Sequence, residues 1–223
     1  MRAGKQRRNI VLTGFWDPTG RMLKDFCWDL RLNLDGWKGA NWEQRGYNVH
    51  SFYSYLRSGL FEVAYRKVWR DFWNIVPRLE PVAVIGFGVG PGDWVVEEYA
   101  RNLDRWGDDG TAVGQPDPNP PDGGRPAGYV RISTLPGEAI VQAIRSQTTL
   151  DARVHGDVGM GAFICEYMAY LAMWYQEQTQ RRTADRRCEM TGFIHVGAGV
   201  SLSDATEATK ITVCEVIESL GDD

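Results

Sequence analysis

The sequence "VAVIGFG" at residues 82–88 is a run of apolar residues that contains and ends in glycine. A second, largely apolar run, "NIVLTGF", occupies residues 9–15. Neither run shows the strict polar and apolar alternation of a strand with one face in water. Such runs are typical of β-strands that are covered on both faces, as in sheets packed between two layers of helices.

The rest of the chain alternates between strand and helix patterns. Further strands are predicted at residues 128–134, 151–156 and 190–197. Helices are predicted at residues 60–76, 136–147, 161–178 and 203–220, the last with Ser203 or Asp204 as its N-cap. This alternation predicts an α/β fold, a three-layer α/β/α sandwich with a mostly parallel central sheet. We expect residues 1–223 to form a single domain.

Composition excludes several classes of protein. With 223 residues, 43% of them hydrophobic, the chain can bury a full core. Its formal net charge of −4 argues against a nucleic-acid partner. No apolar run reaches about 18 residues and no signal-peptide core is visible, so we expect a cytoplasmic protein without membrane attachment. The arginine-rich residues 1–8 are expected to form a flexible arm.

Neither a metal nor a cofactor is expected. The four cysteines lie at positions without CxxC spacing, which argues against a zinc site or a disulfide framework and for reduced thiols. The glycine-rich "GFGVGPG" at residues 86–92 has Pro91 where the last glycine of a dinucleotide-binding fingerprint would stand.

Residues 107–128, "GDDGTAVGQPDPNPPDGGRPAG", are too rich in Pro, Gly and Asp for a helix or strand. The segments on either side are each too small to carry a parallel sheet alone, so a linker between domains is disfavoured. Two interpretations stay open: a long surface loop beside a functional site, or a plain surface excursion.

Three reactive side chains fall near the ends of predicted strands, where α/β sheets carry their sites. His195 ends the strand at residues 190–197, Cys165 follows the strand at 151–156, and Glu97 or Glu98 lies on a short extended piece just past a sheet edge. A thiol, an imidazole and a carboxylate are the parts of a nucleophilic cysteine site. Cys165 is otherwise a small core residue, and His155 is either a structural histidine or a neighbour of the site.

Several ordered motifs resemble those of one family. "VLTGFWDPTGR" is similar to an opening around TGFxPFG, "GFGVGPGDWVVEEYARN" to a G-L-x-x-G-R-x-x-I-x-[IL]-E-x-x-A-x-N segment, and "ISTLPGEAIVQAIR" to STLP followed by a helix. "GAFICEYMAYLAMW" is similar to AGxFLCNxxxY, and "FIHVG" to FIHVP. The family is pyroglutamyl peptidase I, the pyrrolidone carboxyl peptidases. The resemblance extends from residue 9 to about 199 and is faint between 24 and 74.

This resemblance implies the α/β/α fold and a cysteine peptidase mechanism without a cofactor. The family's nucleophile falls on Cys165, its general base on His195 and its acidic third member on Glu97. Phe15 matches an aromatic residue that lines the lactam pocket, and Phe163 matches another beside the nucleophile. The family's habit also implies a homo-oligomer, either a dimer or a tetramer.

The departures from the family pattern fall where the substrate is held. Asp17 stands in place of part of the opening PF pair, and Glu166 in place of the asparagine after the cysteine. Two acids near the pocket predict altered recognition, with weak activity on ordinary pyroglutamyl amides and a preference for a basic substrate.

Three functions remain open from the residues alone. The first is a hydrolase of a pyroglutamyl, lactam or related amide, on a small molecule or a peptide. The second is a thioester-based acyl transferase or lactam-forming tailoring enzyme. The third is a non-catalytic binding protein on the same fold, which the intact Cys165 disfavours.

Overall fold

The computed structural model describes residues 8–15, 47–52, 61–108, 114–157, 159–183 and 187–221. The strands are β1 (Arg8–Thr13), β2 (Tyr47–Phe52), β3 (Ala83–Gly90), β4 (Trp94–Glu97), β5 (Tyr99–Arg101), β6 (Val130–Ile132), β7 (Ala152–His155) and β8 (Met190–Gly197). The helices are α2 (Tyr65–Leu79), α3 (Gly137–Gln147), α4 (Ile164–Thr179) and α5 (Leu202–Leu220). Most of the predicted arm and residues 109–113 of the predicted loop lie outside the described residues.

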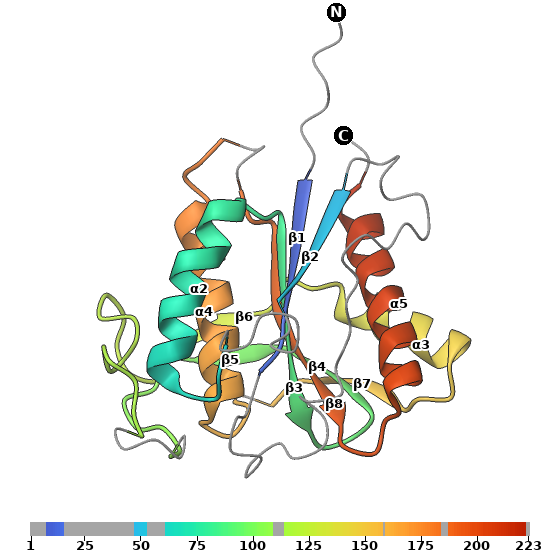
Figure 1. The fold of residues 1–223 in the computed structure, drawn as a ribbon, viewed down its shortest axis with the longest axis horizontal. Coiled ribbons are helices and arrows are strands. Elements are labelled where there is room, and N and C mark those ends of the chain that lie inside the picture. Colours follow the sequence, from blue (N-terminus) through green and yellow to red (C-terminus); the bar gives the residue numbers. More distant parts are fainter. Residues whose placement is uncertain are drawn as a thin grey trace, which may run out of the picture.

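The main sheet has six strands in the order β2-β1-β3-β8-β4-β7. All neighbours are parallel except β4 and β8, which are antiparallel. Helices α2 and α4 cover one face of the sheet, and α3 and α5 cover the other (Figure 1). The predicted α/β/α sandwich with a mostly parallel sheet is therefore confirmed.

Two hydrophobic cores explain why the central strands read as apolar runs. On β3, Ile85 and Phe87 pack into the core beneath α3 and α5, whereas Val84 packs into the core beneath α2 and α4. Since successive side chains of a strand point to opposite faces, a strand between two helical layers needs apolar or small residues at every position.

Three helix starts differ from the predictions. The helix predicted from Leu60 begins at Tyr65, because Phe61 takes a positive φ of 48° and Ala64 is extended. The last helix is capped by Ser201 rather than by Ser203 or Asp204, since the Ser201 hydroxyl accepts a hydrogen bond from the Asp204 amide at 3.1 Å. Helix α4, predicted from Gly161, begins at Ile164, because Ala162 takes a positive φ of 61° and Phe163 is extended.

The orientation of β4 corrects the sequence prediction for Glu97. Because β4 runs antiparallel to β8, its carboxyl end does not meet the carboxyl ends of β3 and β8 at one sheet edge. Glu97 instead pairs in register with Phe193, inside the sheet. The prediction that this acid lies just past a sheet edge is wrong, since the sequence pattern does not reveal strand direction.

Strand β3 carries glycine at every second position on the face beneath α4. A Cβ added at Gly86 would lie 2.5 Å from Cδ2 of Phe193, one at Gly88 would lie 2.9 Å from the sulfur of Cys165, and one at Gly90 would lie 2.4 Å from Cγ of His195. These glycines therefore leave the space that the neighbouring side chains occupy.

In addition, no helix in the described part of the chain is long and apolar enough to span a membrane.

We predict that Gly86→Ala lowers the free energy of unfolding by about 1–3 kcal/mol, because its new methyl group overlaps the buried Phe193 ring. Urea denaturation measures the change. Gly199→Ala is the matched control, since a Cβ there meets nothing within 4 Å. Equal stability of the two variants would contradict the tight packing at β3.

Candidate active site

Glu97 and His195 form the most closely bonded pair in the site. Nδ1 of His195 lies 2.6 Å from Oε1 of Glu97, and both residues are buried. Glu97 pairs in register with Phe193, so it is a diagonal cross-strand neighbour of His195, two residues further along β8. A carboxylate on Nδ1 fixes the orientation of the ring and leaves Nε2 as the nitrogen for proton transfer.

Cys165 is the second residue of α4, where backbone N–H groups lack partners within the helix. Its sulfur packs against Gly88, which pairs in register with His195 on the neighbouring strand. The strand glycine and the helix start therefore bring the thiol and the imidazole to the same part of the sheet face. The positive end of the helix dipole favours a thiolate at this position.

The other cysteines occupy different surroundings. Cys188 is fully buried, and burial raises the pKa of its thiol well above the ordinary value. Cys214 is partly exposed on α5, on the opposite face of the sheet, and Cys27 lies outside the described residues. Of the described cysteines, only Cys165 lies at the start of a helix and packs near a strand that carries a histidine.

The side chain of Glu166 is fully buried, and its carboxylate forms an ion pair with Arg101. Arg101 donates to its two carboxylate oxygens from Nε at 2.7 Å and from Nη2 at 3.0 Å, and the Arg101 amide donates at 3.1 Å. The amide of Ala162 adds a fourth hydrogen bond at 2.9 Å. Hydrogen bonding to Glu166 also raises the pKa of Arg101. This geometry favours a role in holding the start of α4 over the predicted contact with substrate.

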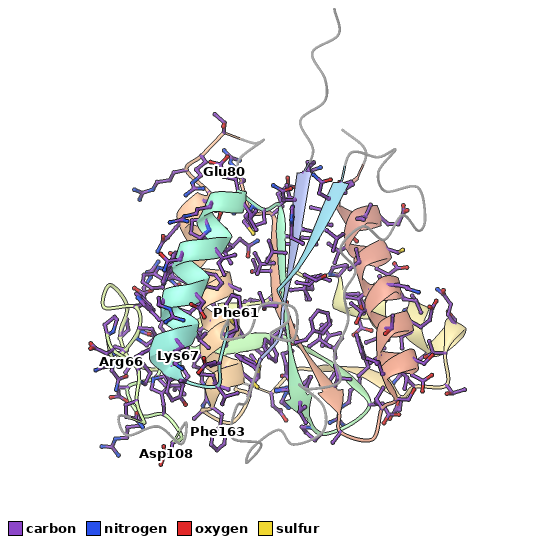
Figure 2. The ribbon with its side chains drawn as sticks, in the orientation of Figure 1. Phe61, Arg66, Lys67, Glu80, Asp108 and Phe163 are labelled. Carbon is purple, nitrogen blue, oxygen red and sulfur yellow. The ribbon has the colours of Figure 1, made fainter. Side chains whose placement is uncertain are left out.

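Two aromatic residues predicted to line the pocket lie in different surroundings. Phe15 is buried, with its ring 6.2 Å from that of Phe193. Phe163 directly precedes α4 and is 47% exposed. Figure 2 shows Phe163 beside Asp108, at the end of the molecule where β3 and β8 finish. Asp17, the remaining predicted pocket residue, lies outside the described residues.

The predicted long loop starts beside the site and then packs away from it. Gly107 donates from its amide to the carbonyl of Ala162 at 2.7 Å, and the Phe163 ring covers Gly107. Further along, the side chain of Asn102 donates to the carbonyls of Asp122 and Arg125, each at 3.0 Å. The first residues of the loop therefore contact the start of α4, whereas residues 122–125 are tied to the segment after β5.

Two further residues complete this site, of which Arg101 was not predicted and His155 was predicted as one of two alternatives. Arg101 lies 65 positions before Glu166, and no local pattern marks it as the partner of a buried acid. His155 hydrogen bonds to Glu97 through Nδ1 at 2.7 Å, which decides between its two interpretations in favour of a neighbour of the site. The alternating glycines of "GFGVG" are the one signal for close packing over β3 that the sequence offers.

In the described part of the chain, no group of three or more His, Cys, Asp or Glu side chains is arranged to hold a metal ion.

No protein-family model and no curated protein matches the chain. Solved structures, in contrast, match almost its whole length. Pyrrolidone carboxyl peptidase from Thermococcus litoralis superposes with a TM-score of 0.72 at 18% identity, over 96% of this chain and 94% of that one. Pyroglutamyl peptidase I from Bacillus amyloliquefaciens gives a TM-score of 0.69 at 22% identity, over 95% and 96%. A mutant pyrrolidone carboxyl peptidase from Pyrococcus furiosus gives 0.68 at 21% identity, over 95% and 99%.

This chain therefore has the fold of the pyroglutamyl peptidases, as the sequence motifs predict.

We predict that Arg101→Met destabilises the protein by about 3–5 kcal/mol, because it leaves the carboxylate of Glu166 buried without a counter-charge. Glu166→Met should cost less, since the Arg101 side chain is 28% exposed and water can solvate it. Arg66→Met, which breaks an exposed ion pair with Asp117, is the control and should change stability by less than about 1 kcal/mol. Urea denaturation measures the free energy of unfolding of the three variants. Equal losses of stability would contradict the role of Arg101 as the counter-charge of Glu166.

A second prediction concerns thiol reactivity. At pH 7, iodoacetamide should modify Cys165 at least about tenfold faster than the other cysteines, because a helix N-terminus and a nearby imidazole favour the thiolate. Peptide mapping by mass spectrometry measures each site. Cys188 should react last, since its raised pKa and burial both oppose reaction. Uniform slow labelling of all cysteines would rule out an activated thiol.

Proposed function

We propose that this protein is a cysteine peptidase or amidase that cleaves a pyroglutamyl, lactam or related amide through a thioester on Cys165. The observation that carries the proposal is the 2.6 Å contact between Nδ1 of His195 and Glu97, next to a thiol at the start of α4. The likeness to pyroglutamyl peptidase structures supports it through the shared fold.

The first half of the reaction forms the thioester. The Cys165 thiolate attacks the amide carbonyl carbon, and the backbone N–H groups at the start of α4 stabilise the resulting oxyanion. His195, which holds the thiol proton on Nε2, gives it to the leaving nitrogen as the carbon–nitrogen bond breaks. Glu97 accepts from Nδ1 and stabilises the imidazolium before that transfer.

The second half of the reaction releases the acid. His195, now neutral, takes a proton from water, and the hydroxide formed attacks the thioester carbon. The carbon–sulfur bond breaks, and Cys165 returns as a thiolate beside the protonated His195.

The pairing of Glu166 with Arg101 removes one of the two charges that predict a basic substrate and so favours a neutral one. Of the two acids that predict a preference for cations, Glu166 is neutralised by Arg101, and Asp17 lies outside the described residues. Phe163 exposes an aromatic surface two residues before the nucleophile, which suits a flat, neutral lactam ring. We propose that recognition differs from that of ordinary pyroglutamyl peptidases, since the residues around Asp17 and Glu166 differ. Action in the cytoplasm as a homodimer or homotetramer is part of the same proposal.

We predict that Cys165→Ala and His195→Ala abolish hydrolysis of an aminocoumarin amide, while Glu97→Gln slows it less. The panel consists of pyroglutamyl, prolyl and lysyl aminocoumarin, with release followed by fluorescence. We expect a neutral cyclic acyl group to react faster than the lysyl group. Cys214→Ala, on the far face of the sheet, is the matched control and should keep full activity. Full activity in Cys165→Ala would exclude covalent catalysis by this thiol.

A further inference from the structure

Glu97 is hydrogen bonded to two histidines at once. Its Oε1 lies 2.6 Å from Nδ1 of His195, and its Oε2 lies 2.7 Å from Nδ1 of His155. This arrangement follows from the sheet, in which β4 lies between β8 and β7 and Glu97 pairs in register with His155. Each oxygen of the carboxylate therefore serves a different imidazole.

The two histidines differ in their access to water. The side chains of Glu97 and His195 are 4% and 7% exposed, whereas that of His155 is 30% exposed. Nε2 of His155 also lies 3.7 Å from Oδ2 of Asp157, a side chain that is almost fully exposed. His155 is therefore the member of this three-residue chain that exchanges protons most readily with solvent.

We propose that His155 is a positioning residue that holds the Glu97 carboxylate for His195 and that, when protonated, weakens the support Glu97 gives to the His195 imidazolium. The proposal rests on the function proposed for Cys165, His195 and Glu97. A neutral His155 fixes one oxygen of Glu97 by donating from Nδ1 and leaves the full negative charge for His195. A protonated His155 shares that charge and repels a second imidazolium across the same carboxylate.

The charged and titratable groups around His155 come from four segments. Glu97 contacts it from β4, and the Glu98 carboxylate reaches Gly156, where an added Cβ would lie 3.2 Å from Oε2. Asp157 lies on its own segment, and Arg153 lies two residues earlier on the same face of β7. Arg101 from β5 packs over Gly159, and His195 acts through Glu97.

This arrangement predicts the sign of the pH effect. The reactive form of the site pairs the Cys165 thiolate with the His195 imidazolium. A proton on His155 places a second positive charge against the carboxylate that supports the His195 imidazolium, and this makes that pair less stable. The reactivity of Cys165 should therefore fall more steeply on the acid side than in a protein that lacks a titrating group at position 155.

The test uses two substitutions of His155 and one control. His155→Ala removes the hydrogen bond to Glu97, whereas His155→Asn keeps an N–H donor near the place of Nδ1 but cannot titrate. His50→Asn is the matched control, because His50 lies on β2 and contacts Asn9. For each protein, the rate of Cys165 alkylation is measured from pH 5 to pH 8, and the imidazole ¹⁵N signals are followed over the same range. The chain has only three histidines, so these variants also assign the signals.

We expect His155→Ala to slow alkylation at pH 8 about tenfold, the loss typical of a hydrogen bond to a charged group. His155→Asn should restore most of that rate and should show a shallower fall towards pH 5. In the unaltered protein, the His195 signals should shift together with the titration of His155, and this shift should vanish in His155→Asn.

Two results would overturn the inference while leaving the proposed function intact. The first is alkylation in both His155 variants with the rate and pH dependence of the unaltered protein. The second is an equal, pH-independent loss in His155→Ala and His155→Asn, as a purely structural role would give. If Cys165 is no more reactive than Cys214, the proposed function fails. The ¹⁵N signals then test the inference separately, and it is overturned if the His195 signals shift with pH in His155→Asn as they do in the unaltered protein.

Discussion

The buried Glu97 carboxylate is the group around which the site is organised. An ionised carboxylate inside a protein is stable only when charges or hydrogen-bond donors satisfy it. Here the antiparallel insertion of β4 between β8 and β7 supplies two imidazole donors, one on each side. On the other side of β8, its parallel pairing with β3 places His195 next to Gly88 and Gly90, where absent side chains leave room for the ring and for the Cys165 sulfur.

A second buried charge holds the segment that carries the nucleophile. Glu166 binds the side chain and amide of Arg101 and the amide of Ala162, so it ties the start of α4 to β5. Ala162 has a positive φ of 61°, an unusual conformation for a residue with a side chain. Glu166 directly follows Cys165 and Ala162 lies three residues before it, so we infer that the position of the thiol depends on this anchor.

Much of this arrangement was predictable from sequence. Largely apolar runs with glycine near their ends indicate β1 and β3, and the helical spacing of apolar residues indicates α4. Both patterns show which residues of a single strand or helix are buried. Cys165, His195 and Glu97 were predicted as site residues from motifs and from the strands near them, although Glu97 lies inside the sheet and not past its edge. What stayed hidden was non-local: the direction of β4, the strand β2, the residue Arg101, and the hydrogen bond of His155 to Glu97. Arg101 and His155 lie 65 and 58 positions from the acids they bind. Residue spacing in one sequence carries no signal for such pairs.

The most direct test of the account is a crystal structure of the protein after treatment with an aldehyde analogue of pyroglutamate. An aldehyde reacts with an activated thiolate to give a thiohemiacetal, which resembles the tetrahedral intermediate of amide cleavage. We expect a covalent bond from Cys165 to the aldehyde carbon, with its oxygen against the backbone N–H groups at the start of α4 and Nε2 of His195 within hydrogen-bonding distance. An unmodified Cys165 at saturating aldehyde, or an adduct that places the oxygen away from the helix start, would contradict it.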